Sequence, residues 1–314
     1  MELIRENRNI FNDSIAFIEQ YDPGLSNRTH EDRLYTVTTI ASVCYNKPDI
    51  IGKQSLYDRL SVEGAGIPSS SFSFVPVLLT NEQVNEIAGM CYARGEENVP
   101  DIITFGQIVS STIGNNLEKR LLTNLRALLQ DLGWQVDGAK AKELSEQFFN
   151  TSEIDIQMIR EHYKVYKVNV DMATSKQWIR HNFHLQELSR RYVSAKKLDF
   201  TFYISEDMKN VNSKTCFQDE NGNHINLDTQ DVIDIALNHY NAAIESGVAP
   251  QSARRIIPQC AYTTIWTGIT PRVLKNMLKI RTKAGAQWEF RQFAVQIEAW
   301  ENVNTTPKGS DESK

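Results

Sequence analysis

A change of hydrophobic period along the chain constrains the fold most. Residues 80–161 carry apolar side chains at three- and four-residue spacing, which is typical of amphipathic helices. The parts of the chain on either side contain β-branched and alternating runs that predict strands. We therefore expect an α+β fold, with a mostly antiparallel central sheet flanked by long helices and an inserted helical subdomain.

These patterns predict four parts along the chain. Residues 1–79 are expected to form the N-terminal part of the main domain, and 80–161 the inserted helical subdomain. Residues 162–301 would form the core of the main domain, which carries the chemistry. Residues 302–314 have the polar composition of a disordered tail.

The local patterns also predict individual elements. Strands are expected at 72–77, 163–173 and 197–205, and 36–45 is either a strand or a short buried helix. Helices are expected at 116–133, after Ser152 as an N-cap, at 229–246, and over 271–300. The polar segment 209–226 is expected to be a loop that turns at Asn221-Gly222.

Charge and cysteine content exclude several classes of protein. A formal net charge of −5 argues against non-specific binding to nucleic acid or to acidic membranes. No run of 18 apolar residues is present, and the N-terminus lacks the apolar region of a signal peptide. The 4 cysteines are scattered without a CxxC pair, which predicts reduced thiols in a cytoplasmic protein and no metal site.

The stretch QWIRHNFHLQELSRRY, residues 177–192, concentrates polar chemistry. Arg180 and Arg191 can each donate two hydrogen bonds to phosphate oxygens. Ser189 adds a hydroxyl, Glu187 an acceptor, and Gln177 either function. The same residues on a solvated helix would only form surface ion pairs worth a few tenths of a kcal/mol.

Two later stretches are similarly ambiguous when each is taken alone. In ARRIIP, residues 253–258, two arginines precede an apolar triplet and could simply extend from a helix end into solvent. In PRVLKNMLKIRTKAGAQWEFR, residues 271–291, Arg272, Asn276 and Lys279 recur near helical spacing, as on many surface helices.

The three stretches taken in order resemble the flavin-dependent thymidylate synthase family. The resemblance covers roughly residues 163–300 and, more weakly, 36–76. It includes QWxRH, ELSxRY, the phrase GVAPQSARRIIP, and LKIRTKAGAQWE. It implies methylation of dUMP to dTMP, with methylene-tetrahydrofolate as carbon donor and FAD, reduced by NADPH, as hydride source. It also implies a homotetramer with its sites at subunit interfaces.

The resemblance also assigns residues. Positions that bind dUMP in the family are matched by Gln177, Arg180, Glu187, Ser189, Arg190, Arg191, Arg254 and Arg281. Positions on the FAD side are matched by Arg180, His181, Asn182, Gln186, Thr270, Arg272 and Asn276. Arg281 would be catalytic, because its cation beside the uracil stabilises developing negative charge. Arg190 stands where the family usually has a small residue, so the resemblance implies contact through its backbone amide.

The sequence departs from the family pattern mainly on the flavin side. RHNFH lacks one residue and the second arginine of the family signature, and Gln186 replaces an asparagine. Histidines are missing at Gly285 and in GAGIPSS, and Thr270 stands at an asparagine position. The chain thus resembles divergent members such as phage genomes carry. Two alternatives stay open: a related enzyme that hydroxymethylates or acts on dCMP, and a nucleotide-binding protein without catalysis.

Overall fold

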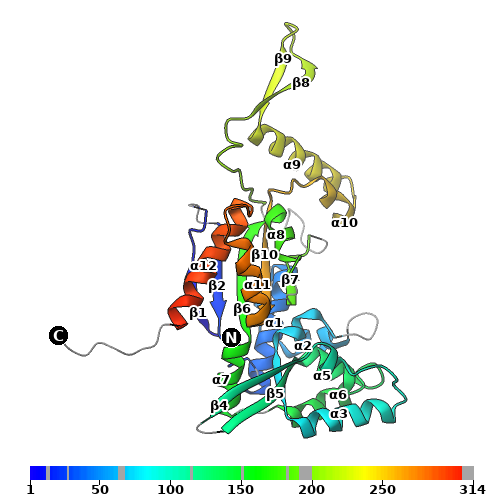
Figure 1. Ribbon diagram of the computed structural model, residues 1–314. Helices are drawn as coiled ribbons and strands as arrows, with labels where there is room; N and C mark the ends of the chain where they lie inside the picture. Colours follow the sequence, from blue (N-terminus) through cyan, green and yellow to red (C-terminus); the bar gives the residue numbers. More distant parts are fainter. Residues whose placement is uncertain are drawn as a thin grey trace, which may run out of the picture.

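The main sheet of the protein is five-stranded and antiparallel, which confirms the α+β prediction (Figure 1). This computed structural model describes residues 1–11, 15–26, 28–62, 68–113, 116–149, 152–181, 184–190 and 200–305. The strand order is β1 (Leu3–Asn7), β2 (Phe17–Tyr21), β6 (Lys164–Asp171), β10 (Tyr262–Ile269) and β7 (His184–Glu187). The predicted strand at 163–173 is therefore the central strand β6.

One face of this sheet is covered by the C-terminal helices. α11 (Pro271–Arg281) and α12 (Trp288–Thr305) confirm the helices predicted there, and α8 (Met172–Trp178) packs beside them (Figure 1). Tyr166 on β6, Met277 on α11 and Phe293 on α12 are fully buried in one apolar cluster. Burying such side chains contributes about 1.5–3 kcal/mol each, so this face is a major source of stability.

A second sheet has the order β3 (Pro76–Leu79), β5 (Asn116–Asn124) and β4 (Gln107–Ile113). Pro76 begins an edge strand, where a missing N–H is tolerated. The helix predicted over 116–133 is wrong in its first half. Residues 116–124 pair with strands on both sides, and this pairing overrides their helical spacing. The Asn124 side chain then accepts from the Ala127 N–H and caps the following helix.

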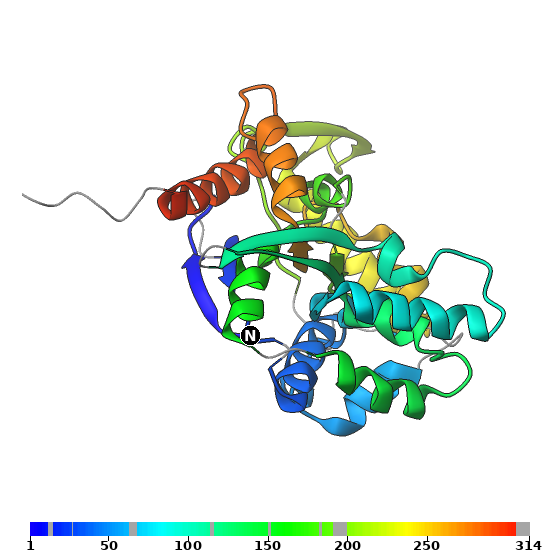
Figure 2. The ribbon, with the colours of Figure 1, turned by 60° about the horizontal axis from the view of Figure 1, so that its bottom comes forward.

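Helices pack around this second sheet, and those other than α7 share one core with it (Figure 2). The α-helices are α1 (His30–Tyr45), α2 (Gln54–Val62), α3 (Asn81–Ala93), α4 (Asp101–Thr104), α5 (Leu125–Asp131), α6 (Gly138–Ser145) and α7 (Glu153–His162). Short 3₁₀ helices are η1 (Pro48–Ile50), η2 (Ser70–Phe74) and η3 (Glu146–Phe148). Residues 36–45 are thus helical, η2 replaces the first part of the strand predicted at 72–77, and Ser152 caps α7 as predicted.

The core of this half combines residues from both sides of position 80. Val37 and Phe72 pack in the same apolar cluster as Ile87, Leu128 and Phe148. α1 also contributes Ile40 to a cluster with Val165 and Trp266 of the main sheet. The helices around the second sheet therefore also support the second face of the main sheet.

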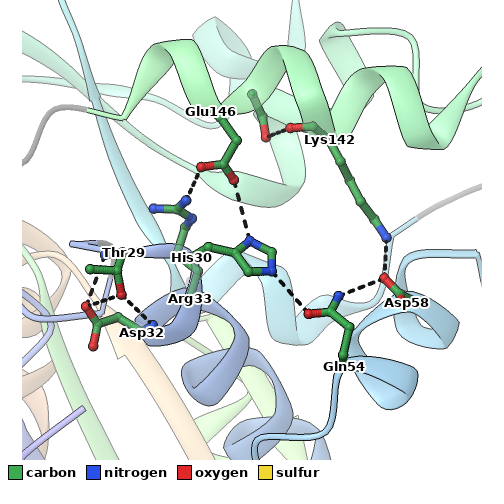
Figure 3. Close-up of polar contacts among 9 residues, drawn as sticks. Thr29, His30, Asp32, Arg33, Gln54, Asp58, Lys142 and Glu146 are labelled. Carbon is green, nitrogen blue, oxygen red and sulfur yellow. Dashed lines mark hydrogen bonds and ion pairs between the residues drawn. The ribbon is translucent and has the colours of Figure 1, made fainter.

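A polar network holds α1 and α2 against α6 and η3 (Figure 3). The buried Arg33 guanidinium pairs with Glu146 and lies 3.9 Å from the Phe149 ring centre. His30 lies between Glu146, at 3.7 Å, and Gln54, at 3.2 Å. Lys142 pairs with Asp58 at 2.9 Å.

A separate arm extends from one end of the main sheet (Figure 1). It comprises the hairpin β8 (Asn212–Gln218) and β9 (His224–Asp228), then α9 (Thr229–Glu245), α10 (Pro250–Ala253) and η4 (Arg254–Ile256). The turn at Asn221-Gly222 is confirmed, with Gly222 at φ 80°, but the predicted loop is mostly a hairpin. Residues 212–218 are mostly polar and show no alternation of apolar side chains, so the strand was not predicted.

Two other expectations concern the ends of segments. The strand predicted at 197–205 is wrong within the described residues 200–205, where only one bridge, Phe202 to Ala261, forms. The predicted tail begins inside α12, which continues to Thr305, and 306–314 lie outside the described residues. Among the helices that the structure describes, none has the length and apolar character needed to cross a bilayer.

The ion pairs of Figure 3 should differ in their effect on stability. Glu146→Gln should lower the free energy of unfolding by about 2 kcal/mol, because it removes the carboxylate that pairs with the buried Arg33 cation. Asp58→Asn, the matched control, should cost less than about 1 kcal/mol, because Lys142 can be hydrated. Chemical denaturation followed by circular dichroism measures both. Equal losses in the two variants would contradict this account.

Candidate functional site

The pairing of β7 with β10 places the polar stretch that follows His184 beside a cavity. β7 pairs with β10 from His184 to Glu187, and the Leu188 N–H continues the ladder by donating to the Thr264 carbonyl at 2.9 Å. Ser189 and Arg190 follow at the end of this strand. The residues just after β7 are thereby placed against the C-terminal half of the chain.

The arm supplies the other wall of this cavity. Arg254 opens η4, directly after α10, and its neighbours Ala253 and Ile257 are buried in a cluster with Tyr240 of α9. The cavity has a volume of about 460 Å³. It is lined by Met172, Lys176, Glu187, Leu188, Ser189, Arg190, Arg254, Arg255, Ile257, Gln259 and Thr263. We call it the arginine pocket.

The arginine pocket has the electrostatics of an anion site. Its described lining contains the cations Lys176, Arg190, Arg254 and Arg255 and one carboxylate, Glu187. The protein as a whole is acidic, so this concentration of positive charge is local. Guanidinium groups donate several hydrogen bonds in fixed geometry and suit phosphate oxygens.

Arg190 is the most unusual residue of this pocket. Its side chain is only 8% exposed. Nη2 donates to the Tyr262 carbonyl, and the guanidinium carbon lies 4.5 Å from the Phe200 ring centre. Burial lowers the pKa of Arg190 to about 10, which still leaves it a cation at neutral pH. Its Nε and Nη1 are buried and have no hydrogen-bond partner among the described residues.

A second group of predicted residues meets at the end of α11. Arg281 Nε donates to His181 Nε2 at 3.2 Å, and its guanidinium carbon lies 5.0 Å from the Phe290 ring centre. The His181 ring stacks on Phe290 with centroids 6.0 Å apart. Burial and the Arg281 charge both lower the pKa of His181, which favours the neutral ring. Burial, then the charge of Arg180, lowers the pKa of Arg281, so the two arginines are near one another.

The predicted flavin residues of α11 present a polar face. Arg272 and Asn276 are exposed and lie one helical turn apart, after Thr270 at the N-cap position. Within the described part of the chain, neither Arg180 nor Arg272 forms an ion pair. Exposed, unpaired arginines fit the pyrophosphate of a dinucleotide such as FAD.

Four other residues that the resemblance assigns to the site are found in neither of these two groups. Gln186 faces α1 and η2, where it accepts from Ser70 and donates to Cys44 Sγ, so it points away from its strand neighbour Glu187. Gln177 is half-buried in α8 and does not appear in the described lining of the arginine pocket. Asn182 and Arg191 lie outside the described residues.

The structure thus forms two groups from the predicted set. Glu187, Ser189, Arg190 and Arg254 line the arginine pocket, whereas Arg180, His181 and Arg281 do not contribute to its described lining. Sequence reasoning missed Lys176 and Arg255 in the pocket. Arg255 was visible as the second arginine of ARRIIP, but no pattern distinguished Lys176 from an ordinary surface lysine.

His184 lies in a different environment from both groups. Its Nδ1 is 2.9 Å from the Tyr163 hydroxyl, and the two side chains pack where Gly268 leaves room, since a Cβ there would lie 2.0 Å from that hydroxyl. It lines a separate cavity of about 250 Å³ with Ser73 and Arg126. Burial lowers the pKa of His184 to about 4. His184 is therefore a buried ring that is neutral at neutral pH and packs against Tyr163.

Cys91, Glu96 and Asp131 bring three ligand-type atoms within 4.8 Å of one another. The Asp131 carboxylate, however, accepts from the backbone N–H groups of Asp101 and Ile102 at 2.8 and 2.7 Å. Its two oxygens thus already stabilise the start of α4. This cluster fits a structural function better than a metal site.

The C-terminal half of the chain matches a known family. The profile of the family described as thymidylate synthase complementing protein matches residues 156–303. The flavin-dependent thymidylate synthase of Thermosipho africanus is 28% identical over 139 residues, which are 42% of this chain and 60% of that protein. The enzyme of the same name from Aquifex aeolicus is 29% identical over 152 residues, 46% of this chain and 47% of that protein.

The similarity covers only part of this chain and only part of each relative. The chain spans between 47% and 60% of the length of these two relatives. Among solved structures, the UMP/dUMP methylase PolB from Streptomyces cacaoi, bound with 5-Br dUMP, is 22% identical with a TM-score of 0.34. That likeness covers 45% of this chain and 66% of PolB.

The low pKa of His184 predicts a pH dependence of stability. The unfolded histidine titrates near 6.5 and the folded one near 4, so the unfolded state binds more protons between these values. The free energy of unfolding should fall as pH drops from 6.5 towards 4, by at most about 3 kcal/mol from this group. His184→Gln should lose that part of the slope, measured by denaturation at pH 7, 6, 5 and 4. An unchanged slope would contradict the burial of a neutral His184.

Proposed function

We propose that this chain is a flavin-dependent thymidylate synthase, on the premise that its residues 156–303 match the profile of the thymidylate synthase complementing protein family. It would methylate dUMP to dTMP, with methylene-tetrahydrofolate as carbon donor and FAD, reduced by NADPH, as hydride source. The relatives that share its C-terminal half carry this enzyme name. The proposal extends to the whole reaction, which the shared half alone does not define.

The arginine pocket carries the proposal. Four residues predicted to bind dUMP, Glu187, Ser189, Arg190 and Arg254, come from two segments of the chain and line one cavity. A solvated surface gives no reason for arginines from separate elements to converge. A nucleotide monophosphate supplies both the dianion that balances these cations and a base and sugar that can accept and donate hydrogen bonds.

Each residue then has a function in binding. Arg254 and the Ser189 hydroxyl would bind the phosphate, and Glu187 would accept a hydrogen bond from the sugar or the base. Arg281 would lie beside the uracil and stabilise the negative charge that develops as the base attacks the carbon donor. The neutral His181 ring, stacked on Phe290, holds the Arg281 guanidinium in place.

The positive charges of two exposed arginines support the binding of FAD. Arg180 and Arg272 would hold the pyrophosphate of FAD, and Asn276 would donate to the flavin or its linker. When bound, the reduced flavin supplies the hydride that completes the methyl group. Gln186 is already bound to Ser70 and Cys44, so we assign it to the support of β7 and not to the cofactor.

We propose that the active site is shared between subunits of a homotetramer. Within one chain, the arginine pocket and the Arg281 group are separate, although both are needed for the same nucleotide. The arm also exposes large apolar side chains, among them Val232 and Ile235 on α9 and Phe217 on β8. Exposed apolar surface of this kind is typical of interfaces between subunits.

The proposal also includes a cytoplasmic location and a place among the divergent members of the family. Cys44, Cys91 and Cys260 form no disulfide among the described residues, which favours a reducing compartment such as the cytoplasm. The shortened RHNFH segment and the additional residues before position 156 favour a divergent member, such as phage genomes carry.

Product analysis tests the proposed function. The purified protein should bind FAD and, with dUMP, methylene-tetrahydrofolate and NADPH under anaerobic conditions, form dTMP identified by its mass. Arg281→Ala should lower kcat about 100-fold or more, because a charge that stabilises the transition state is lost. Lys140→Ala, an exposed change on α6, should leave kcat unchanged.

Three results would contradict this proposal. A protein that takes up no FAD would exclude flavin chemistry. A hydroxymethylated product, or turnover of dCMP in place of dUMP, would favour the related pyrimidine-modifying reaction. Full activity of Arg281→Ala with an unchanged melting temperature would remove the catalytic function of that residue.

A further inference from the structure

The buried side chain of Arg190 is not explained by packing alone. One end of the guanidinium is held by the Tyr262 carbonyl and the Phe200 ring. The Nε and Nη1 donors of the same group are buried and have no partner among the described residues. Leaving a charged donor buried and without a hydrogen-bond partner destabilises the folded protein. Buried Nε atoms without a partner also occur at Arg120 and Arg126, but among the described arginines Arg190 is the one that leaves a second buried nitrogen, Nη1, unpartnered as well.

The position of Arg190 indicates what completes its hydrogen bonds. It lines the arginine pocket together with Ser189 and the cations Lys176, Arg254 and Arg255. An acceptor that enters such a pocket is favoured if it is anionic, since the described lining contains four cations and one carboxylate. The oxygens of a phosphate ester meet both requirements, because each can accept from a separate donor and the group carries two negative charges.

We propose that the Arg190 side chain binds the phosphate of the nucleotide directly and makes this site select nucleotides over nucleosides. This inference rests on the proposed function for the identity of the nucleotide. It differs from the expectation drawn from the resemblance, in which a small residue at this position contributes only its backbone amide. Arg190 is here a specificity-determining residue.

The pyrophosphate of FAD is the other phosphate available to the site. Ser189, Glu187 and Arg254 share the cavity with Arg190, whereas the exposed arginines assigned to the cofactor, Arg180 and Arg272, do not contribute to its described lining. The monophosphate is therefore the ligand that the arginine pocket favours. Competition between the two ligands distinguishes them.

Calorimetric titration of the full-length protein tests the inference. The ligands are dUMP and deoxyuridine, which differ only in the phosphate. The variants are Arg190→Lys, which keeps the charge but not the guanidinium donors, and Arg190→Gln. Lys140→Gln on α6 is the control, because it removes an exposed positive charge outside the pocket. Circular dichroism verifies that each variant is folded.

The wild type should bind dUMP at least 100-fold more tightly than deoxyuridine. Both Arg190 variants should lose about 10- to 100-fold in dUMP affinity, as expected for charge-assisted hydrogen bonds. Their affinity for deoxyuridine should change less than threefold, so the preference for the phosphate shrinks. Lys140→Gln should match the wild type. Added FAD should not displace dUMP from the wild type.

Other outcomes separate failure of this inference from failure of the proposed function. If the wild type binds no dUMP, the proposed function fails. If it binds dUMP and the folded Arg190 variants keep the full preference for dUMP, the inference fails alone. An equal loss for both ligands would assign Arg190 a structural function, and displacement of dUMP by FAD would assign the pocket to the cofactor.

Discussion

The antiparallel pairing of β6 with β10 is the contact on which the rest of the structure depends. It joins residues 164–171 to 262–269 through eight consecutive pairs, from Tyr262 with Asp171 to Ile269 with Lys164. β2 adds to one edge of this pair and β7 to the other. The C-terminal helices cover one face through Met277 and Phe293, and the helix α1 supports the other through Ile40.

This pairing also positions the chemistry. β7 brings Ser189 and Arg190 to the end of the sheet, and the arm brings Arg254 to the same place. Charged side chains of one sign are costly to gather in a folded protein unless a ligand of opposite charge balances them. The cations that line the arginine pocket therefore favour binding of an anion. Arg281, at the far end of α11, meets His181 instead, and a second subunit would bring such a group to each pocket.

The sequence predicted the parts whose signal is local. The period of 271–300, the Ser152 cap, the Asn221-Gly222 turn and the strand β6 all follow from side chains within the segment itself. The errors arise where distant partners decide the structure. Residues 116–124 have helical spacing but pair with β3 and β4. Residues 212–218 pair with 224–228 in a hairpin, although their composition is that of a loop.

The same distinction applies to the site. The order of motifs was sufficient to predict Glu187, Ser189 and Arg254, which the fold brings together. The buried side chain of Arg190 depends on Tyr262 and Phe200, which no local pattern connects to it. Likewise, Gln186 was expected to contact the flavin because of its place in the motif. Its position on β7, however, directs its side chain towards Cys44 and Ser70.

A crystal structure of the protein with dUMP tests the central claim most directly. The account predicts the phosphate within hydrogen-bond distance of Arg190 Nε or Nη1, Ser189 and Arg254 of one subunit. It predicts the uracil beside Arg281 of a second subunit. A nucleotide bound elsewhere, or one bound in this pocket while both Arg190 donors stay unpartnered, would contradict it.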